Sequence, residues 1–234
     1  MTKYSRTADN AIYLNEDRFV EPKESFKQIA EILDLKNARG TLADIGCATG
    51  EFLYYVRTLN AEIGLTGVDY SEALVEHGNV RGAAHGIKIL CGDANALPLE
   101  DHSCDIVTTI GVTSIFDDFR PSFKEMIRVA KSGGRCLNHM AVNEDAMDVI
   151  IRYVKPDGSL ESGWNRFSLD SIKKFLDENV DVESYDLIKH KMPFDLARQD
   201  DPMRSWTREI NGERVLWNGL GSEVALYHII FNIK

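Results

Sequence analysis

The sequence predicts an α/β fold built on a doubly wound parallel sheet. Three observations indicate it. Short apolar runs alternate with helix-like stretches over residues 38–142, several of these runs end in an acid or a glycine, and a turn of small residues at 46–50 joins the first run to a helix. Alternating strands and helices favour a parallel sheet covered by helices on both faces. Ligands of such a sheet bind at the carboxyl ends of its strands, so functional residues are expected at that edge.

The first predicted strand, 42–45, ends in a turn that lets a ligand approach bare backbone. A helical apolar face resumes at 51–56, so the free amides of a helix N-terminus are expected at this turn. Small residues occupy every second position of the turn, and Asp44 stands two residues before the first of them. Glycine permits the sharp bend that such a turn requires. The small residues are Gly46, Ala48 and Gly50.

The second predicted strand, 63–70, ends in an acid. Asp69 lies 19 residues beyond Gly50, close to the roughly 20 expected between a glycine turn and a carboxylate that binds ribose hydroxyls. A helix is predicted to follow over 71–85, because Ser71 with Glu72 behind it is a suitable helix start.

The remaining core elements continue the alternation of strand and helix. The turn Gly92-Asp93-Ala94 follows the third strand, and the turn Ser132-Gly133-Gly134 precedes the fifth. Both turns contain the small residues that end regular elements. The strands are predicted over 87–91, 104–110 and 135–142, and the helix before the last of them over 121–131.

Residues 38–142 resemble the class I S-adenosylmethionine-dependent methyltransferases, whose first motif is commonly acid-x-Gly-x-Gly-x-Gly. Ala48 stands in place of the middle glycine, and its methyl group narrows the space near the methionine end of the cofactor. Lys131-Ser132-Gly133-Gly134 stands where the family usually has Lys-Pro-Gly-Gly. The resemblance implies a Rossmann-like sheet of seven strands whose last strand is antiparallel.

The resemblance also implies S-adenosylmethionine as the cofactor and a role for each strand end. The turn after the first strand would hold the methionine moiety, Asp69 the ribose hydroxyls, and Asp93 with Ala94 the adenine. Ile110 and Gly111 would bound the methionine moiety from the end of the fourth strand. The residues implied to line the cofactor site are Asp44, Gly46, Cys47, Gly50, Asp69, Tyr70, Asp93, Ala94, Ile110, Gly111 and Tyr13.

We expect one domain over residues 1–234, with an N-terminal lid at 1–37, the cofactor-binding core at 38–142 and a C-terminal half at 143–234. Helical spacing of apolar residues predicts a helix over 23–35 in the lid. In the family, aromatic side chains of this region often lie near the cofactor. Tyr4 and Tyr13 are the candidates here, and packing of one on the sheet with exposure of the other is the alternative.

The C-terminal half is expected to contain a short helix-like piece and a loop over 143–167, and then three regular elements. These are a helix over 168–179 capped by Ser168, a sixth strand over 182–189 and a seventh over 224–233.

An insert at 191–221 is too long for a plain connection between two strands. Asn211-Gly212 between two β-prone runs predicts a β-hairpin inside it. We expect this hairpin to carry Trp206 and Trp217 and to lean over the carboxyl edge of the sheet.

Methyl transfer from a sulfonium is an in-line displacement whose donor is already activated, so an enzyme mainly positions the acceptor and excludes water. A hydroxyl acceptor usually needs a base. His139 is the first candidate because histidine titrates near neutral pH, although a strand histidine satisfied by a carbonyl is an equal alternative. Asp117, with Asp118 beside it, is the second. Residues of the insert that could face the acceptor are His190, Asp195, Phe194, Trp206 and Trp217.

No metal is expected, because no histidines or cysteines show the spacing of a ligand set. The four cysteines fall in or beside core strands and are expected to be reduced and structural. The net charge is −10 and the pI about 5.1, which disfavours nucleic acid as a partner. A small-molecule acceptor, no membrane association and a cytoplasmic location are expected, and the oligomeric state stays open.

The expected function is transfer of a methyl group to an oxygen or nitrogen of a small molecule such as a sugar or a secondary metabolite. One alternative is a methyltransferase-like binding or regulatory subunit without catalysis. Another is an NAD(P)-dependent reductase, because Tyr185 and Lys189 match a Tyr-x-x-x-Lys motif, although on a strand-like pattern. Aminopropyl transfer is a third, with only Asp117 and Asp118 to bind a polyamine.

Overall fold

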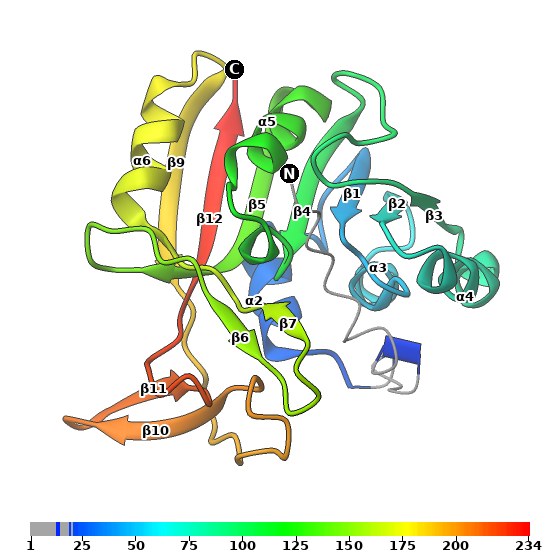
Figure 1. The fold of residues 1–234 in the computed structure, drawn as a ribbon. Coiled ribbons are helices and arrows are strands. Elements are labelled where there is room, and N and C mark those ends of the chain that lie inside the picture. The colour runs from blue at the N-terminus through cyan, green and yellow to red at the C-terminus, as the bar shows by residue number, and fades with distance from the viewer. Residues whose placement is uncertain (1–12, 15–18, 20) are drawn as a thin grey trace.

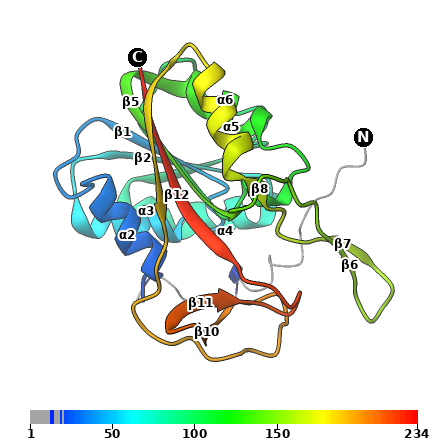
Figure 2. The same cartoon turned by 90° about the vertical axis from the view of Figure 1, so that its left-hand side faces the viewer.

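The computed structural model describes residues 13–14, 19 and 21–234, and a single twisted sheet runs through the middle of this part. Figure 1 shows the sheet with its helices, and Figure 2 shows it from the side with helices on both faces. The expectation for Tyr4 lies outside the described residues.

The main strands follow the order β3-β2-β1-β4-β5-β12-β9, and β8 pairs with β5 as an additional short strand. The first five strands in sequence are parallel, whereas β12 is antiparallel to both of its neighbours. This arrangement confirms the predicted doubly wound sheet with an antiparallel last strand. The strands are β1 (Thr41–Ile45), β2 (Gly64–Asp69), β3 (Ile87–Cys91), β4 (Cys104–Ile110), β5 (Ala130–Asn143), β8 (Phe167–Ser168), β9 (Val182–Lys189) and β12 (Ala225–Ile233).

The helices cover the two faces of the sheet and bury two separate apolar clusters. Phe26 and Phe52 bring α2 and α3 onto one face, against Leu137 and Ile230 of the sheet. Aromatic residues of α5 and α6 pack on the other face, where Phe123 stacks on Phe231 of β12. The helices are α2 (Glu24–Ile32), α3 (Glu51–Leu59), α4 (Glu72–Gly82), α5 (Arg120–Val129) and α6 (Leu169–Glu178), with short 3-10 turns η1 (Ala83–His85) and η2 (Thr113–Ile115).

The ends of the helices agree closely with the sequence patterns. The side chain of Ser168 accepts a 3.0 Å hydrogen bond from the backbone N–H of Ser171, which confirms the predicted cap of α6. The glycine turn predicted at 132–134 lies within β5, where Cys104 pairs with Ala130 and Ile106 pairs with Arg135. The extra residues of β5 therefore form a bulge, and Gly133 takes the left-handed φ of +73° that it requires.

The helix-like piece expected within 143–167 is wrong. That segment instead forms a small antiparallel hairpin of β6 (Arg152–Val154) and β7 (Leu160–Ser162). Its tight turn is favoured by Gly158, whose φ is +83°, and by Asp157, whose side chain accepts the N–H of Ser159 at 2.9 Å. These turn-forming residues give the segment a hairpin in place of the expected helix-like piece.

The hairpin predicted inside the insert is confirmed as β10 (Trp206–Ile210) and β11 (Glu213–Trp217). Asn211 and Gly212 both have positive φ, as a type I′ turn demands. Figure 1 places this hairpin beyond the end of the sheet toward which the parallel strands run. Leu216 of β11 packs there against Ala141 of β5.

All four cysteines are free and lie in or beside core strands, as expected; three of them are buried, and Cys91, at the end of β3, is exposed. Within the described residues, no helix is long and apolar enough to cross a lipid bilayer.

Candidate functional site

The turn after β1 depends on left-handed backbone at three positions. The φ angles of Gly46, Ala48 and Gly50 are +69°, +50° and +85°. A side chain at Gly46 would clash with Val112, so this position requires glycine for space as well as for backbone conformation. A Cβ at Gly50 would lie 3.1 Å from Ile89 Cδ1. The glycines of the motif are therefore explained by the left-handed backbone and the limited space of this turn.

The turn leads directly into the N-terminus of α3, where backbone amides without helical partners gather. The hydroxyl of Thr49 is buried here and has no hydrogen-bond partner among the described residues. Buried Glu51 lies 3.8 Å from the ammonium of Lys23, which also lies 5.2 Å from the ring centre of Tyr13. A polar ligand at this helix end would find unsatisfied donors.

Asp44 is a buried acid beneath the turn. One of its carboxylate oxygens accepts a 2.8 Å hydrogen bond from Thr108 of β4, and the side chain is 3% exposed. Burial is the main cause that raises the pKa of Asp44 to about 7. The negative charge of Asp69 adds to this effect, while the hydrogen bond from Thr108 and the positive charge of Lys23 oppose it. Such a carboxyl is favoured in its charged form when a cation binds beside it.

Asp69 at the end of β2 faces the same turn. Its carboxylate accepts the backbone N–H of Ala48 at 2.8 Å and that of Ser71 at 2.9 Å. Burial raises its pKa, and these two hydrogen bonds oppose the rise. A carboxylate has about four acceptor positions, so Asp69 keeps acceptor capacity for a hydroxyl group of a ligand. The structure thus brings Asp44 and Asp69 together at the turn.

The other residues predicted for the cofactor follow along the edge of the sheet. Cys47 is buried in the turn, and burial raises the pKa of its thiol well above its usual value, so it stays protonated. Tyr70 is 56% exposed beside the end of β2. Asp93 accepts the N–H of Asn95 at 2.9 Å in the turn after β3, and Ala94 is buried next to it.

The end of β4 is packed against β5 and against an aromatic ring. The N–H of Gly111 donates to the carbonyl of His139 at 2.8 Å, and Ile110 pairs with His139 in the sheet. A Cβ at Gly111, whose φ is +74°, would lie 3.3 Å from Cζ3 of Trp164. Trp164 is therefore a wall of this part of the site that the sequence did not single out.

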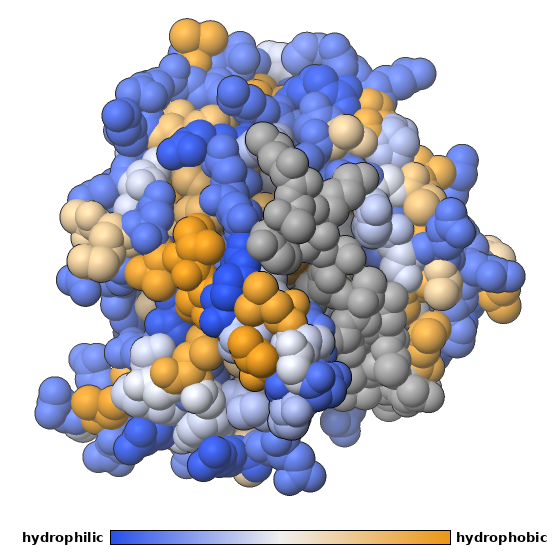
Figure 3. All heavy atoms as spheres, viewed as in Figure 1, coloured by the Kyte–Doolittle hydropathy of each residue, from blue (hydrophilic) through white to orange (hydrophobic). Residues whose placement is uncertain are grey.

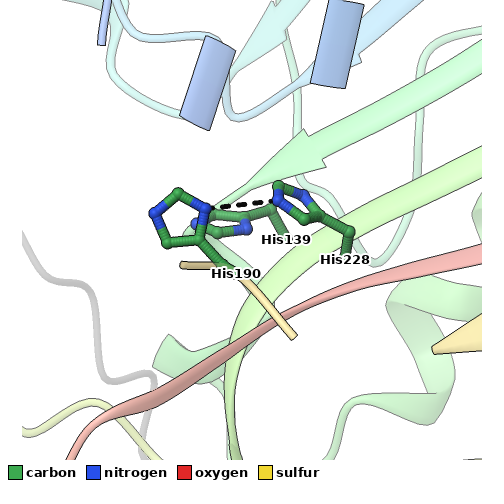
Figure 4. A group of neighbouring side chains, drawn as sticks. All are labelled: His139, His190 and His228. Carbon is green, nitrogen blue, oxygen red and sulfur yellow. Dashed lines mark hydrogen bonds between the residues drawn. The ribbon is translucent and has the colours of Figure 1, made fainter. Parts of the chain in front are cut away.

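His139 does not stand alone, because two other histidines surround it. His228 of β12 pairs with it across the sheet, with ring centres 4.6 Å apart, and the ring of His190 lies 5.1 Å away (Figure 4). Burial is the first cause that lowers the pKa of all three: that of His228 to about 4 and that of His139 well below its usual value. The reason for which the sequence favoured His139 as a base, titration near neutral pH, therefore does not hold in the fold.

The ion pair and the hydrogen bond of Asp117 are made with residues other than these three histidines. Its carboxylate is ion-paired with Arg152, and Asp118 forms an ion pair of 3.1 Å with Arg120. Both carboxylates are thus already paired with arginines. These contacts weaken the case for Asp117 as a base and the case for aminopropyl transfer.

Three of the insert residues named as candidates contact arginine side chains. Asp195 pairs with Arg214 at 2.7 Å, and Phe194 is 47% exposed. Trp206 and Trp217 face each other across the hairpin and lie under Arg198 and Arg208 respectively.

Sequence reasoning missed four residues of the site: Lys23, Thr49, Trp164 and His228. Lys23 and Trp164 lie far from the motif in sequence and reach it only through the fold. Thr49 could have been found, because it lies in the turn itself.

The residues of the turn therefore fit an elongated ligand with a cationic end and hydroxyl groups. Asp44 with its raised pKa suits the cation, Asp69 suits vicinal hydroxyls, and the free amides of α3 and the Thr49 hydroxyl suit polar groups between them.

Comparison with known proteins agrees with this geometry. The family model described as "Methyltransferase domain" matches residues 43–138, which run from β1 into β5. The chain is 37% identical over 105 residues to the demethylmenaquinone methyltransferases of several Staphylococcus aureus strains, among them JH9 and Newman. The match covers 43% of this chain and 43% of those proteins, so it spans less than half of their length.

Solved structures extend the likeness to the whole fold. The PH0226 protein from Pyrococcus horikoshii is 17% identical with a TM-score of 0.60, covering 96% of this chain and 99% of that chain. A SAM-dependent methyltransferase from Methanosarcina mazei is 13% identical with a TM-score of 0.61, covering 86% and 96%. Residues 43–138 thus match a methyltransferase domain, and the described part of the chain has the fold of these solved structures.

Proposed function

We propose that this protein transfers the methyl group of S-adenosylmethionine to an oxygen or nitrogen of a small molecule. The observation that carries the proposal is the meeting of Asp44 and Asp69 at the left-handed turn before α3. A buried acid that a cation would keep charged suits the methionine moiety of this cofactor, and an acid with acceptor capacity left suits its ribose hydroxyls.

In the proposed complex the turn and the start of α3 hold the methionine part, and Asp69 accepts hydrogen bonds from the ribose hydroxyls. Asp93 and Ala94 would contact the adenine. Tyr13, beside Lys23, is our candidate for contact from the N-terminal side. When bound, the cofactor supplies an activated methyl group, so the chain has to orient the acceptor and exclude water.

The acceptor is proposed to lie beside the carboxyl ends of β4 and β5. Trp164 packs on Gly111 there, and the carbonyl of His139 accepts the N–H of Gly111. Large apolar side chains are exposed on the neighbouring segment, and Figure 3 shows apolar groups gathered around the place where Figure 1 draws β6 and β7. Such a surface suits an acceptor with an apolar part. The exposed side chains are Met147, Ile150, Val154 and Leu160.

The reductase alternative is disfavoured by the placement of Tyr185 and Lys189. Both lie on β9, so their Cα atoms are about 13 Å apart along the strand. Their side chains are bound to acids, Tyr185 to Asp177 and Lys189 to Glu144. They do not form one site.

The test is calorimetric titration of the protein with S-adenosylhomocysteine, with NADH as the control ligand. Micromolar binding of the first alone supports the proposal and opens an acceptor screen. That screen should contain sugars, phenols, amines and a demethylated menaquinone, because the relatives named above act on that class. Binding of NADH alone would favour the reductase, and binding of neither would favour the regulatory subunit.

A further inference from the structure

Three histidines form a buried group that the proposed cofactor contacts do not use. His139 comes from β5, His190 follows the end of β9, and His228 comes from β12 (Figure 4). Each ring offers one nitrogen, and the three nitrogens lie within 4.8 Å of one another. We propose that this histidine triad binds a divalent transition-metal ion, with zinc as the best fit.

The spacing of the nitrogens is close to that of a metal site. Tetrahedral zinc with Zn–N bonds of about 2.0–2.1 Å requires its nitrogen ligands to be about 3.3 Å apart. Nδ1 of His190 and Nε2 of His228 are 3.3 Å apart. The widest separation, 4.8 Å, needs a closure of about 1.5 Å, which small side-chain rotations supply.

The triad is only partly satisfied by hydrogen bonds within the protein. Nδ1 of His190 and Nε2 of His228 share a hydrogen bond of 3.3 Å, whereas Nδ1 of His139 is buried and has no partner among the described residues. The exposed fractions of His139, His190 and His228 are 6%, 7% and 0%. A buried nitrogen without a partner costs free energy unless a ligand meets it.

A second layer of polar groups holds the triad from α2. Oε1 of Gln28 lies 3.4 Å from Nε2 of His228, and Nε2 of Gln28 donates to Glu24 at 3.3 Å and to the carbonyl of Lys191 at 3.0 Å. Gln28 therefore links a triad histidine to a carboxylate. Because Gln28 contacts Nε2, the nitrogen of His228 that faces His190, metal binding would replace this contact by a bond to the ion.

The donor set selects among metals. Three imidazoles favour zinc, copper, iron or nickel, whereas magnesium and calcium take oxygen ligands. Three histidines with a fourth position left for water are typical of catalytic zinc. The carbonyl of His139 accepts the N–H of Gly111, so the ion would lie beside the proposed methionine end. That placement rests on the proposed function, but metal binding itself does not.

The experiment uses the full chain without a polyhistidine tag, stripped with a chelator. Zinc is titrated in competition with a chromogenic chelator, and cobalt is added to a second sample for its visible spectrum. We expect about one zinc per chain, the strong absorption of tetrahedral cobalt, and binding at least ~100-fold weaker in His190→Gln. The matched control is His102→Asn, which removes an exposed imidazole at a φ of +52° that asparagine tolerates.

Two results would overturn the inference. One is a zinc affinity equal in His190→Gln and His102→Asn, and the other is a weak octahedral cobalt spectrum in the unaltered protein. The cobalt spectrum requires no variant to fold. S-adenosylhomocysteine is titrated into the same stripped protein, so loss of the metal site and loss of the proposed function are observed separately.

Discussion

The backbone N–H of Ala48 donates a 2.8 Å hydrogen bond to Oδ2 of Asp69, so the end of β2 is joined to the turn that follows β1. The other carboxylate oxygen accepts the N–H of Ser71 at the start of α4. One side chain therefore holds two loop ends in place and also presents acceptor positions to a ligand. Its removal should affect binding through both routes.

Asp69→Ala should weaken S-adenosylhomocysteine binding at least tenfold, because hydrogen bonds to a charged group contribute about 1.5–3 kcal/mol. Asp69→Asn should fall between this variant and the unaltered protein, since an amide oxygen keeps part of the acceptor capacity. Calorimetric titration measures both. Glu72→Ala, which removes the exposed acid three residues later, is the control and should bind normally. An unchanged affinity in Asp69→Ala would refute the assignment of ribose binding.

The turn provides a matched pair of opposite substitutions. Ala48→Gly places glycine at a φ of +50° and should leave unfolding free energy unchanged or raise it by up to about 1 kcal/mol. Gly50→Ala puts a methyl group at a φ of +85° and 3.1 Å from Ile89, and should lower it by about 1–2 kcal/mol. Urea unfolding measures both. If Ala48→Gly also binds S-adenosylhomocysteine more tightly, the Ala48 methyl narrows the site.

The core of the fold could be predicted because each of its elements carries a local signal. β3, β4 and β9 have the predicted bounds, and turn residues mark the limits of the first two: β3 lies between Gly86 and Gly92, and β4 ends before Gly111. Asn211-Gly212 predicted the insert hairpin in the same way, because these two residues favour a tight turn. The helix-like piece expected within 143–167 was wrong because Asp157 and Gly158 form a tight turn between two short strands there.

The candidate site likewise has a part that the sequence predicted and a part that it did not. Asp44, Asp69 and the glycines follow from spacing along one stretch of chain, and the structure brings them together at one turn. His139, His190 and His228 are far apart in sequence, and only the register of β5 with β12 and the end of β9 places them side by side. No rule of spacing along the sequence finds ligands that come from β5, from β12 and from the residue after β9. The sequence therefore predicted no metal.

The cap of α6 should have a measurable effect of its own. Ser168→Ala removes the acceptor of the Ser171 N–H and should lower the free energy of unfolding by about 1 kcal/mol. Ser171→Ala is the neighbouring control: its hydroxyl donates to Asp148 at an exposed position and should contribute about half as much or less. Equal losses in the two variants would show that Ser168 does not act as a cap.

Asp105 lies on β4, next to the strand that carries Asp44, and its pKa is shifted in the opposite direction, so it serves as a control. Burial raises the pKa of Asp105, but hydrogen bonds from Lys131 and from the N–H and hydroxyl of Thr41 outweigh it, so the net pKa is lowered. The charged form of Asp105 is thus favoured by folding. Asp105→Asn should destabilise the protein at pH 7, and the loss should shrink as the pH falls below 4.

Asp44→Asn should instead stabilise the protein, and more so at higher pH. The pKa of Asp44 is about 7 in the folded chain against 3.8 for the ordinary group, so folding takes up a proton between these values. Stability is therefore lost as the pH rises from about 4 to about 7, by up to about 4 kcal/mol. The neutral amide avoids this loss, so urea unfolding at pH 5 and pH 8 should show a larger gain at pH 8. S-adenosylhomocysteine binding should weaken in the same variant, because a buried acid kept at such a cost is expected to serve the ligand. An equal gain in unfolding free energy at pH 5 and pH 8 would show that the charge of Asp44 does not affect the stability of the fold.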